Sequence, residues 1–188
     1  PVMARDLRDM LFIVRRGRRR VIANEQEVLP VLGEEPRLRL VSFDSMPVAQ
    51  QILTVYESSV LIGVHGQALT GFVIFLPADE RRTACVGIQP RPDPRSWEWK
   101  RMVSNLAHAA GVFHRALVAA HAPGCTIDKL RTTNCTAHSQ PDACRRKVSK
   151  ALGNFAMNSV LNCNVTVDPA QLRALIRSAA DHTRGRAA

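Results

Sequence analysis

The stretch SVLIGVHG, residues 59–66, decides the fold class. A continuous apolar run closed by a His-Gly turn predicts a strand that is buried on both faces of a sheet. A comparable run occurs at Met10–Val14 and another at Ala84–Ile88, and further strand candidates are Leu38–Phe43 and Val112–Ala120. Buried strands of this kind are typical of a parallel sheet with helices on both faces.

Helical patterns lie between these runs. Asn24 is placed to cap a helix, Glu27 completes a capping box three residues later, and Gly33 ends the pattern. Ser45 is placed to cap a second helix that starts near Pro47. Strands alternating with short helices in this way predict an α/β fold with a Rossmann-like parallel sheet.

The chain divides into parts of different character. We expect a sheet core over residues 1–120, with a helix at Trp97–Ala109. Residues 121–166 form an irregular, cysteine-bearing segment, residues 167–183 a closing helix of the same domain, and residues 184–188 a frayed tail.

Composition excludes some classes of protein. Hydrophobic residues make up 46% of the 188 residues, so the chain can bury a core and is not disordered overall. Its 26 basic and 16 acidic residues give a net charge of +10, which raises a polyanion or nucleic acid as one possible partner. Aromatic residues are only 5%, too few for a base-stacking surface, so we expect no nucleic acid partner.

Cysteines and glycosylation sequons fall in the same region. Cys85 lies in an apolar run and is expected to be a buried free thiol. The other four cysteines could form two disulfides, with three possible connectivities, or could all be reduced; they are Cys125, Cys135, Cys144 and Cys163. Sequons at Asn134 and Asn164 favour the first alternative and the lumen of the secretory pathway.

Two expected strand ends carry the candidate site residues. Arg15, Arg16 and Arg20 follow the first strand, and His65-Gly66 follows the strand of residues 59–64. Ligands of doubly wound sheets bind beyond the carboxyl ends of the strands. A glycine turn exposes backbone N–H groups, and arginine offers forked donors that suit phosphate oxygens. Together these residues would suit a pyrophosphate.

No metal site is evident from the sequence. It contains no Asp-x-Asp pair and no Cys-x-x-Cys pair, and the remaining histidines match no ligand spacing. We therefore expect neither a metal nor another cofactor.

The same segments carry an ordered set of motifs. In chain order they are Arg15-Arg16, Arg20-Val21-Ile22-Ala23-Asn24-Glu25-Gln26-Glu27, Gln50-Gln51, Ile62-Gly63-Val64-His65-Gly66-Gln67-Ala68-Leu69-Thr70-Gly71, Phe75-Leu76-Pro77 and Ala179-Ala180-Asp181-His182. The set resembles family 61 glycosyltransferases, which include O-linked N-acetylglucosamine transferases acting on EGF domains or on O-mannose, and plant xylosyl- and arabinosyltransferases.

The resemblance implies the carboxyl-terminal, donor-binding lobe of a GT-B enzyme. Its activity would be an inverting transfer of a sugar, N-acetylglucosamine or a pentose, from a UDP-sugar to a protein or glycan hydroxyl. The donor diphosphate and sugar would meet the arginines and the turn, namely Arg15, Arg16, Arg20, His65, Gly66, Gln67, Ala68, Leu69 and Thr70. Asn24, Glu25 and Gln51 would support them, and the general base is not identified.

Departures from the family pattern leave a second interpretation open. Gly87 stands where the family has a glutamate, Gln50 replaces another glutamate, and Gly71 replaces an asparagine. A catalytically degenerate binding module on the same fold is therefore the alternative, and a polyanion-binding domain is a third.

The resemblance also bears on location. It implies a Golgi or endoplasmic reticulum enzyme. No run of 18 apolar residues is present, so any membrane attachment is expected through a segment upstream of Pro1.

Overall fold

The computed structural model describes residues 9–16, 20–77, 82–90, 97–122 and 164–185. Within them, six strands form one open sheet in the order β2-β1-β3-β4-β5-β6. The strands are β1 (Met10–Val14), β2 (Leu38–Ser42), β3 (Val60–Val64), β4 (Ala84–Pro90), β5 (Phe113–His121) and β6 (Val165–Thr166). Neighbours from β2 through β5 pair in parallel, and β6 pairs antiparallel with β5. The fold is therefore α/β with a mixed sheet.

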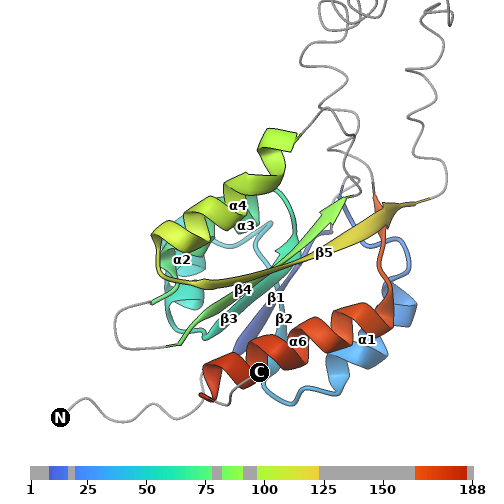
Figure 1. The fold of residues 1–188 in the computed structure, drawn as a ribbon, viewed down its shortest axis with the longest axis horizontal. Coiled ribbons are helices and arrows are strands. Elements are labelled where there is room, and N and C mark those ends of the chain that lie inside the picture. The colour runs from blue at the N-terminus through green and yellow to red at the C-terminus, as the bar shows by residue number, and fades with distance from the viewer. Residues whose placement is uncertain (1–8, 17–19, 78–81, 91–96, 123–163, 186–188) are drawn as a thin grey trace, which may run out of the picture.

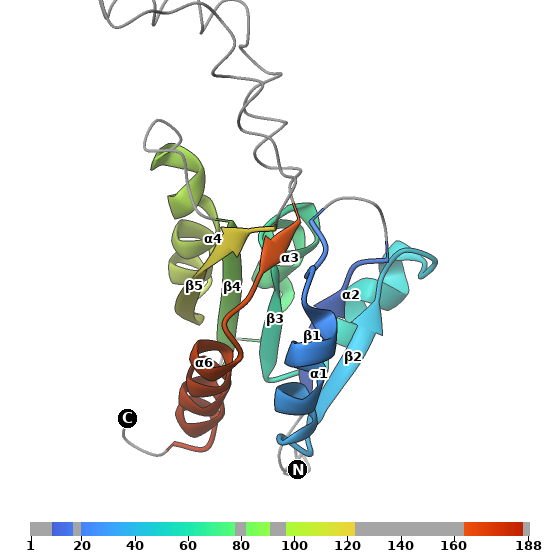
Figure 2. The same ribbon diagram turned by 90° about the vertical axis from the view of Figure 1, so that its right-hand side faces the viewer.

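Helices cover both faces of this sheet. They are α1 (Glu25–Gly33), α2 (Val48–Tyr56), α3 (Gln67–Phe72), the 3-10 turn η1 (Val73–Phe75), α4 (Trp97–Ala109) and α6 (Pro169–Thr183). Figure 1 shows α2, α3 and α4 on one side of the sheet and α1 and α6 on the other. Figure 2 brings α1 and α6 to the front, where both lie over one face of the sheet. The prediction of helices on both faces is confirmed.

Alternate residues of the strands build two separate cores. On the face covered by α1 and α6, the β3 residues Val60, Ile62 and Val64 belong to one core. Leu172 and Ile176 of α6 belong to the same core. The opposite face buries a second set beneath α2, α3 and α4, which includes Leu11, Leu61, Leu69, Cys85 and Val103. All five residues of β1 and of β3 are buried, as expected for strands covered on both sides.

The edges of the sheet differ from the expected pattern. β2 is an edge strand, and its Arg39 and Leu40 are exposed although we expected the strand to be buried on both faces. Residues 121–166 were expected to be irregular, but β5 extends to His121 and Val165–Thr166 forms β6. The two-residue β6 has no sequence pattern of its own, since its pairing with β5 defines it.

Asp168 caps α6, because its Oδ1 accepts hydrogen bonds from the backbone N–H groups of Ala170 and Gln171. The two caps that the sequence predicted do not form. The prediction for Ser45 was wrong: Pro47 occupies the N-cap of α2, with no side-chain cap. Asn24 occupies the N-cap of α1 but makes no side-chain cap, since its Oδ1 accepts from Val167 N–H instead.

None of the helices in the described ranges is long and apolar enough to cross a bilayer.

Candidate active site

The strand order creates a topological switch point between β1 and β3. From β1 the chain passes through α1 to β2 at one edge, and from β3 it proceeds toward β4 on the other side. Connections that leave two neighbouring strands in opposite directions open a crevice beyond their carboxyl ends, where doubly wound folds bind ligands. The residues that follow Val14 and Val64 border this crevice.

Gly66 forms the floor of the site. Its backbone has φ 157° and ψ −174°, a region that is essentially confined to glycine. A β-carbon at Gly66 would lie 2.5 Å from Arg20 Nη1 and 2.9 Å from Arg15 Nη1. Two guanidinium groups from the β1 side therefore converge on the turn that follows β3, and a side chain at Gly66 would have to displace them.

Arg20 has an unusual backbone conformation. Its φ is 59°, and it is the one non-glycine residue with a positive φ in the described part of the chain. Left-handed backbone is uncommon for a branched or long side chain, and strain of this kind clusters at functional sites. The conformation turns the chain so that the Arg20 side chain reaches Gly66.

Two positively charged guanidinium groups lie close together at the turn. Arg15 Nη1 is buried and has no hydrogen-bond partner among the described residues. Arg20 Nη1 and Arg15 Nη1 lie 2.5 and 2.9 Å from the same point, the β-carbon position of Gly66, so the two nitrogens are close to each other. Like charges at this separation repel, and a buried guanidinium without an acceptor is costly. An anion bound here would relieve both.

Arg16 points elsewhere. Its Nη1 lies 3.6 Å from Glu25 Oε1, and its backbone N–H donates to Asp44 Oδ2 at 3.2 Å. Of the three arginines expected at the diphosphate, the structure thus brings Arg15 and Arg20 to the turn and pairs Arg16 with Glu25. Glu25 and both converging arginines also line a hollow beside α1, together with Ile22 and Val64.

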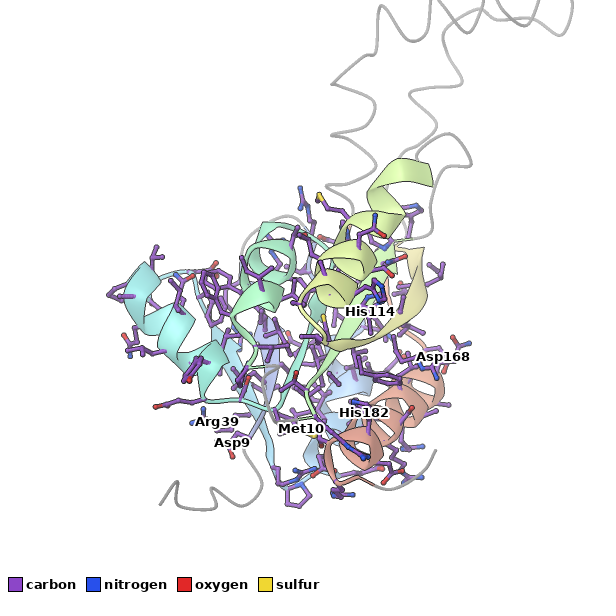
Figure 3. The ribbon with its side chains drawn as sticks, turned by 60° about the vertical axis from the view of Figure 1, so that its left-hand side comes forward. Asp9, Met10, Arg39, His114, Asp168 and His182 are labelled. Carbon is purple, nitrogen blue, oxygen red and sulfur yellow. The ribbon has the colours of Figure 1, made fainter. Side chains whose placement is uncertain are left out.

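His65 is buried beside the turn. Its backbone N–H donates to Ile88 O at 2.8 Å, which fixes the end of β3 against β4. On the same face of the sheet, His114 of β5 reaches over Gly87 of β4. Figure 3 shows the His114 ring between α4 and the sheet. Burial, and then the nearby His65, lower the pKa of His114, so its neutral form is favoured.

The remaining turn residues have mixed roles. The backbone N–H groups of Leu69 and Thr70 donate to Gly66 O, at 3.0 and 2.9 Å, so they are engaged within the turn. The Leu69 side chain is fully buried against Gly63 and Gly87 and belongs to the core. The side chains of Gln67 and Ala68 lie outside the described part. As the first residues of α3, their N–H groups lack an intrahelical acceptor.

Two of the supporting residues brace backbone segments. Gln51 Nε2 donates to Phe43 O and Met46 O, at 3.1 and 2.5 Å, and so holds the loop that contains Asp44. The Asn24 carboxamide bonds the backbone of Val167. Neither side chain faces Gly66, so their effect on the site is indirect.

Other sequence predictions fall partly outside the described residues. The structure does not describe one of the two sequons and four of the cysteines, namely Asn134, Cys125, Cys135, Cys144 and Cys163. Asn164 is described, and its Oδ1 accepts a hydrogen bond from Val21 N–H at 3.2 Å. Cys85 is confirmed as a buried free thiol, and burial raises its pKa to about 12.

Sequence reasoning gave His114 little weight and saw Asn164 only as a sequon. No sequence pattern pairs His114 with Gly87 or Asn164 with Val21, because each contact depends on strand register. The described residues also contain no cluster of three or more His, Cys, Asp or Glu side chains that could hold a metal ion.

Part of the chain matches a known protein family. Residues 4–84 match the family model Glycosyltransferase 61, whereas no curated protein matches the chain. The matched range contains Arg15, Arg20 and Gly66, and hence both strand ends that border the crevice. The converging arginines and the glycine turn lie in the same segment as the family match, so residues 4–84 of this chain are similar to glycosyltransferase family 61.

Proposed function

We propose that this chain is the donor-binding lobe of an inverting GT-B glycosyltransferase that uses a UDP-sugar. The observation that carries the proposal is the convergence of Arg15 and Arg20 on Gly66 at the switch point, inside the range matched to the family. A diphosphate carries negative charge, and its oxygens suit the forked donors of two guanidinium groups.

The arrangement favours departure of the nucleoside diphosphate. When the bond between the sugar C1 and the diphosphate oxygen breaks, negative charge develops on that oxygen. Arg15 and Arg20 stabilise the charge at this moment, because they are already fixed against the turn. The acceptor hydroxyl forms the new bond to C1 from the opposite face, and its proton passes to a general base on another part of the enzyme. The chain has no Asp-x-Asp pair, so we infer that arginines do the work that a carboxylate-held cation does elsewhere.

We infer N-acetylglucosamine or a pentose as the transferred sugar and a protein or glycan hydroxyl as the acceptor. Both follow from the family resemblance. The lumen of the Golgi or endoplasmic reticulum is the corresponding location, with N-glycans on Asn134 and Asn164 and disulfides among the four cysteines between residues 125 and 163. A mobility shift of the secreted protein on treatment with an N-glycosidase tests this location.

Titration calorimetry of the intact protein tests the function. UDP and UDP-sugars should bind, and Arg15→Ala and Arg20→Ala should each weaken UDP binding by about tenfold or more, as expected for a lost charge-assisted contact. Arg177→Ala is the matched control, since this arginine is exposed on α6 and pairs only with Glu34 among the described residues. Absence of UDP binding to the unaltered protein would overturn the proposal.

The degenerate binding module remains a distinct outcome. It predicts UDP-sugar binding without release of UDP in the presence of acceptors. A polyanion-binding domain predicts affinity for nucleic acid that falls steeply with salt.

A further inference from the structure

The backbone that follows Arg20 is held by a distant segment of the chain. Val165 N–H donates to Val21 O at 3.0 Å, and Ala23 N–H donates to Val165 O at 2.8 Å. These two bonds form an isolated bridge between Ile22 and Val165. Residues 21–23 therefore have their hydrogen-bond partners in the region of β6 rather than in their own part of the sheet.

Asn164 adds a side-chain hydrogen bond to the residue that follows Arg20. Its Oδ1 accepts a hydrogen bond from Val21 N–H at 3.2 Å, across 143 residues of sequence. Val21 directly follows Arg20, whose φ is 59°. The bond thus restrains the peptide that joins the left-handed residue to the bridged segment. A change in this peptide would rotate the Arg20 side chain away from Gly66.

Asn24 closes the other end of the same connection. Its Nδ2 donates to Val167 O at 2.8 Å, and its Oδ1 accepts from Val167 N–H at 2.9 Å. A carboxamide donates through Nδ2 and accepts through Oδ1, whereas an aspartate carboxylate could only accept, so aspartate would lose one of the two bonds. These two hydrogen bonds form a further connection between Asn24 and Val167, beside the bridge of Ile22 and Val165.

The segment that provides these partners is itself firmly placed. Val165 and Val167 are buried in the core beneath α6, and β6 pairs with β5. Asp168 caps α6, which packs through Leu172 and Ile176. A backbone anchored on both sides in this manner can transmit its position to the residues bonded to it.

We propose that Asn164 is a positioning residue for the donor site, which acts through Val21 to hold the Arg20 guanidinium over Gly66. The inference rests on the proposed function for the meaning of that site. It extends the site beyond residues 4–84, to a residue that the sequence marks only as a sequon.

Four variants separate the hydrogen bond from the sequon. Asn164→Ala removes the acceptor and the sequon, and Asn164→Gln moves the acceptor by one methylene and also removes the sequon. Asn164→Asp keeps an acceptor at the same distance but removes the sequon. Thr166→Val removes the sequon alone, with a side chain of the same shape on β6.

Binding of UDP and of inorganic pyrophosphate to each intact protein is measured by calorimetry, with the thermal midpoint recorded alongside. We expect Asn164→Ala and Asn164→Gln to weaken both ligands by about tenfold, as for a displaced contact group. Asn164→Asp and Thr166→Val should bind within about twofold of the unaltered protein. Ile176→Val in the core of α6 controls for stability: it should lower the thermal midpoint and leave both affinities unchanged.

Each alternative outcome has its own meaning. Unchanged affinities of Asn164→Ala and Asn164→Gln would overturn the positioning role while the proposed function stands. Equal weakening of ligand binding in all four variants would assign the effect to the glycan and would also overturn the positioning role. Weakening in Ile176→Val equal to that in Asn164→Ala would reduce the role of Asn164 to general stability. No binding to the unaltered protein would instead reject the proposed function itself.

Discussion

The Nε2 atom of His114 lies 3.4 Å from the point that a β-carbon on Gly87 would occupy. Leu69 Cδ2 lies at the same distance from that point. A methyl group could therefore fit between the two, but a longer side chain could not. His114 Nε2 is buried without a hydrogen-bond partner among the described residues, so the imidazole is held by packing.

Substitution at Gly87 tests this packing. Gly87→Ala should change the free energy of unfolding by less than about 1 kcal/mol, whereas Gly87→Glu should lower it by about 1–3 kcal/mol through overpacking. Combining Gly87→Glu with His114→Ala should recover much of the loss, because the second change vacates the space. Urea unfolding measures the free energy of unfolding of the unaltered protein, the two single variants and the double variant. Equal stability of the Ala and Glu variants would contradict the contact.

Gly66 and Gly71 offer a matched pair only five residues apart. Gly66→Ala places a methyl group against both guanidinium groups and strains the backbone, at a cost of about 1–3 kcal/mol. The arginines can swing away, so we expect UDP affinity to fall by about tenfold or more while the protein still folds. Gly71 lies in α3 with nothing within 4 Å of its β-carbon position, so Gly71→Ala should raise stability by about 0.5–1 kcal/mol and leave UDP binding intact. The reverse order of effects on binding would refute the assignment of the site.

Two histidines should make the fold less stable in mild acid. Burial and the nearby His65 lower the pKa of His114, and burial and Arg82 lower the pKa of His182 from its ordinary 6.5. Below pH 6.5 the unfolded chain then binds protons more readily than the folded one, so stability falls as the pH drops. The contribution is fully present above that pH.

Urea midpoints between pH 6.5 and about 5 measure this effect. His182→Phe keeps the stacking on Phe113, whose ring centroid is 4.3 Å away, and removes the titrating group. Combined with His114→Leu, it should flatten the pH dependence over this range. An undiminished slope in the double variant would show that other groups cause it.

Cys85 should behave as an inert thiol. Burial raises its pKa to about 12 from an ordinary 9.0, so the folded protein keeps it protonated where the unfolded chain would not. Its contribution to stability is present below pH 9.0 and declines as the pH rises above that value. Alkylation followed by peptide mass spectrometry should find the residue unmodified in native protein and modified in urea. Cys85→Ala should remove the high-pH decline.

The parallel strands and most helices could be predicted because their signals are local. The apolar runs at β1, β3 and β4 specify strands covered on both sides, and α4 spans Trp97–Ala109 as the pattern indicated. The converging arginines were also foreseen in part, since strand ends of a parallel sheet meet at one edge. Which arginine pairs with Glu25 and which reaches Gly66 depends on side-chain geometry that no spacing encodes.

Long-range contacts account for what the sequence missed. Asn24 is a favourable N-cap residue, but the backbone of Val167 offers its side chain a donor and an acceptor together. The strand at Val165–Thr166 is two residues long and exists through its pairing partners. Contacts of this kind can be recognised only when the positions of both partners in the fold are known.

The bridge between Ile22 and Val165 has a consequence for how the protein is made. The hydrogen-bond partners of the arginine segment lie more than 140 residues later in the chain. Closing so long a loop costs conformational entropy and is slow relative to the pairing of nearby strands. We expect a chain still on the ribosome to form most of its parallel sheet before the proposed donor site is complete. Binding at that site would then arise late, when β6 and α6 have packed against the sheet.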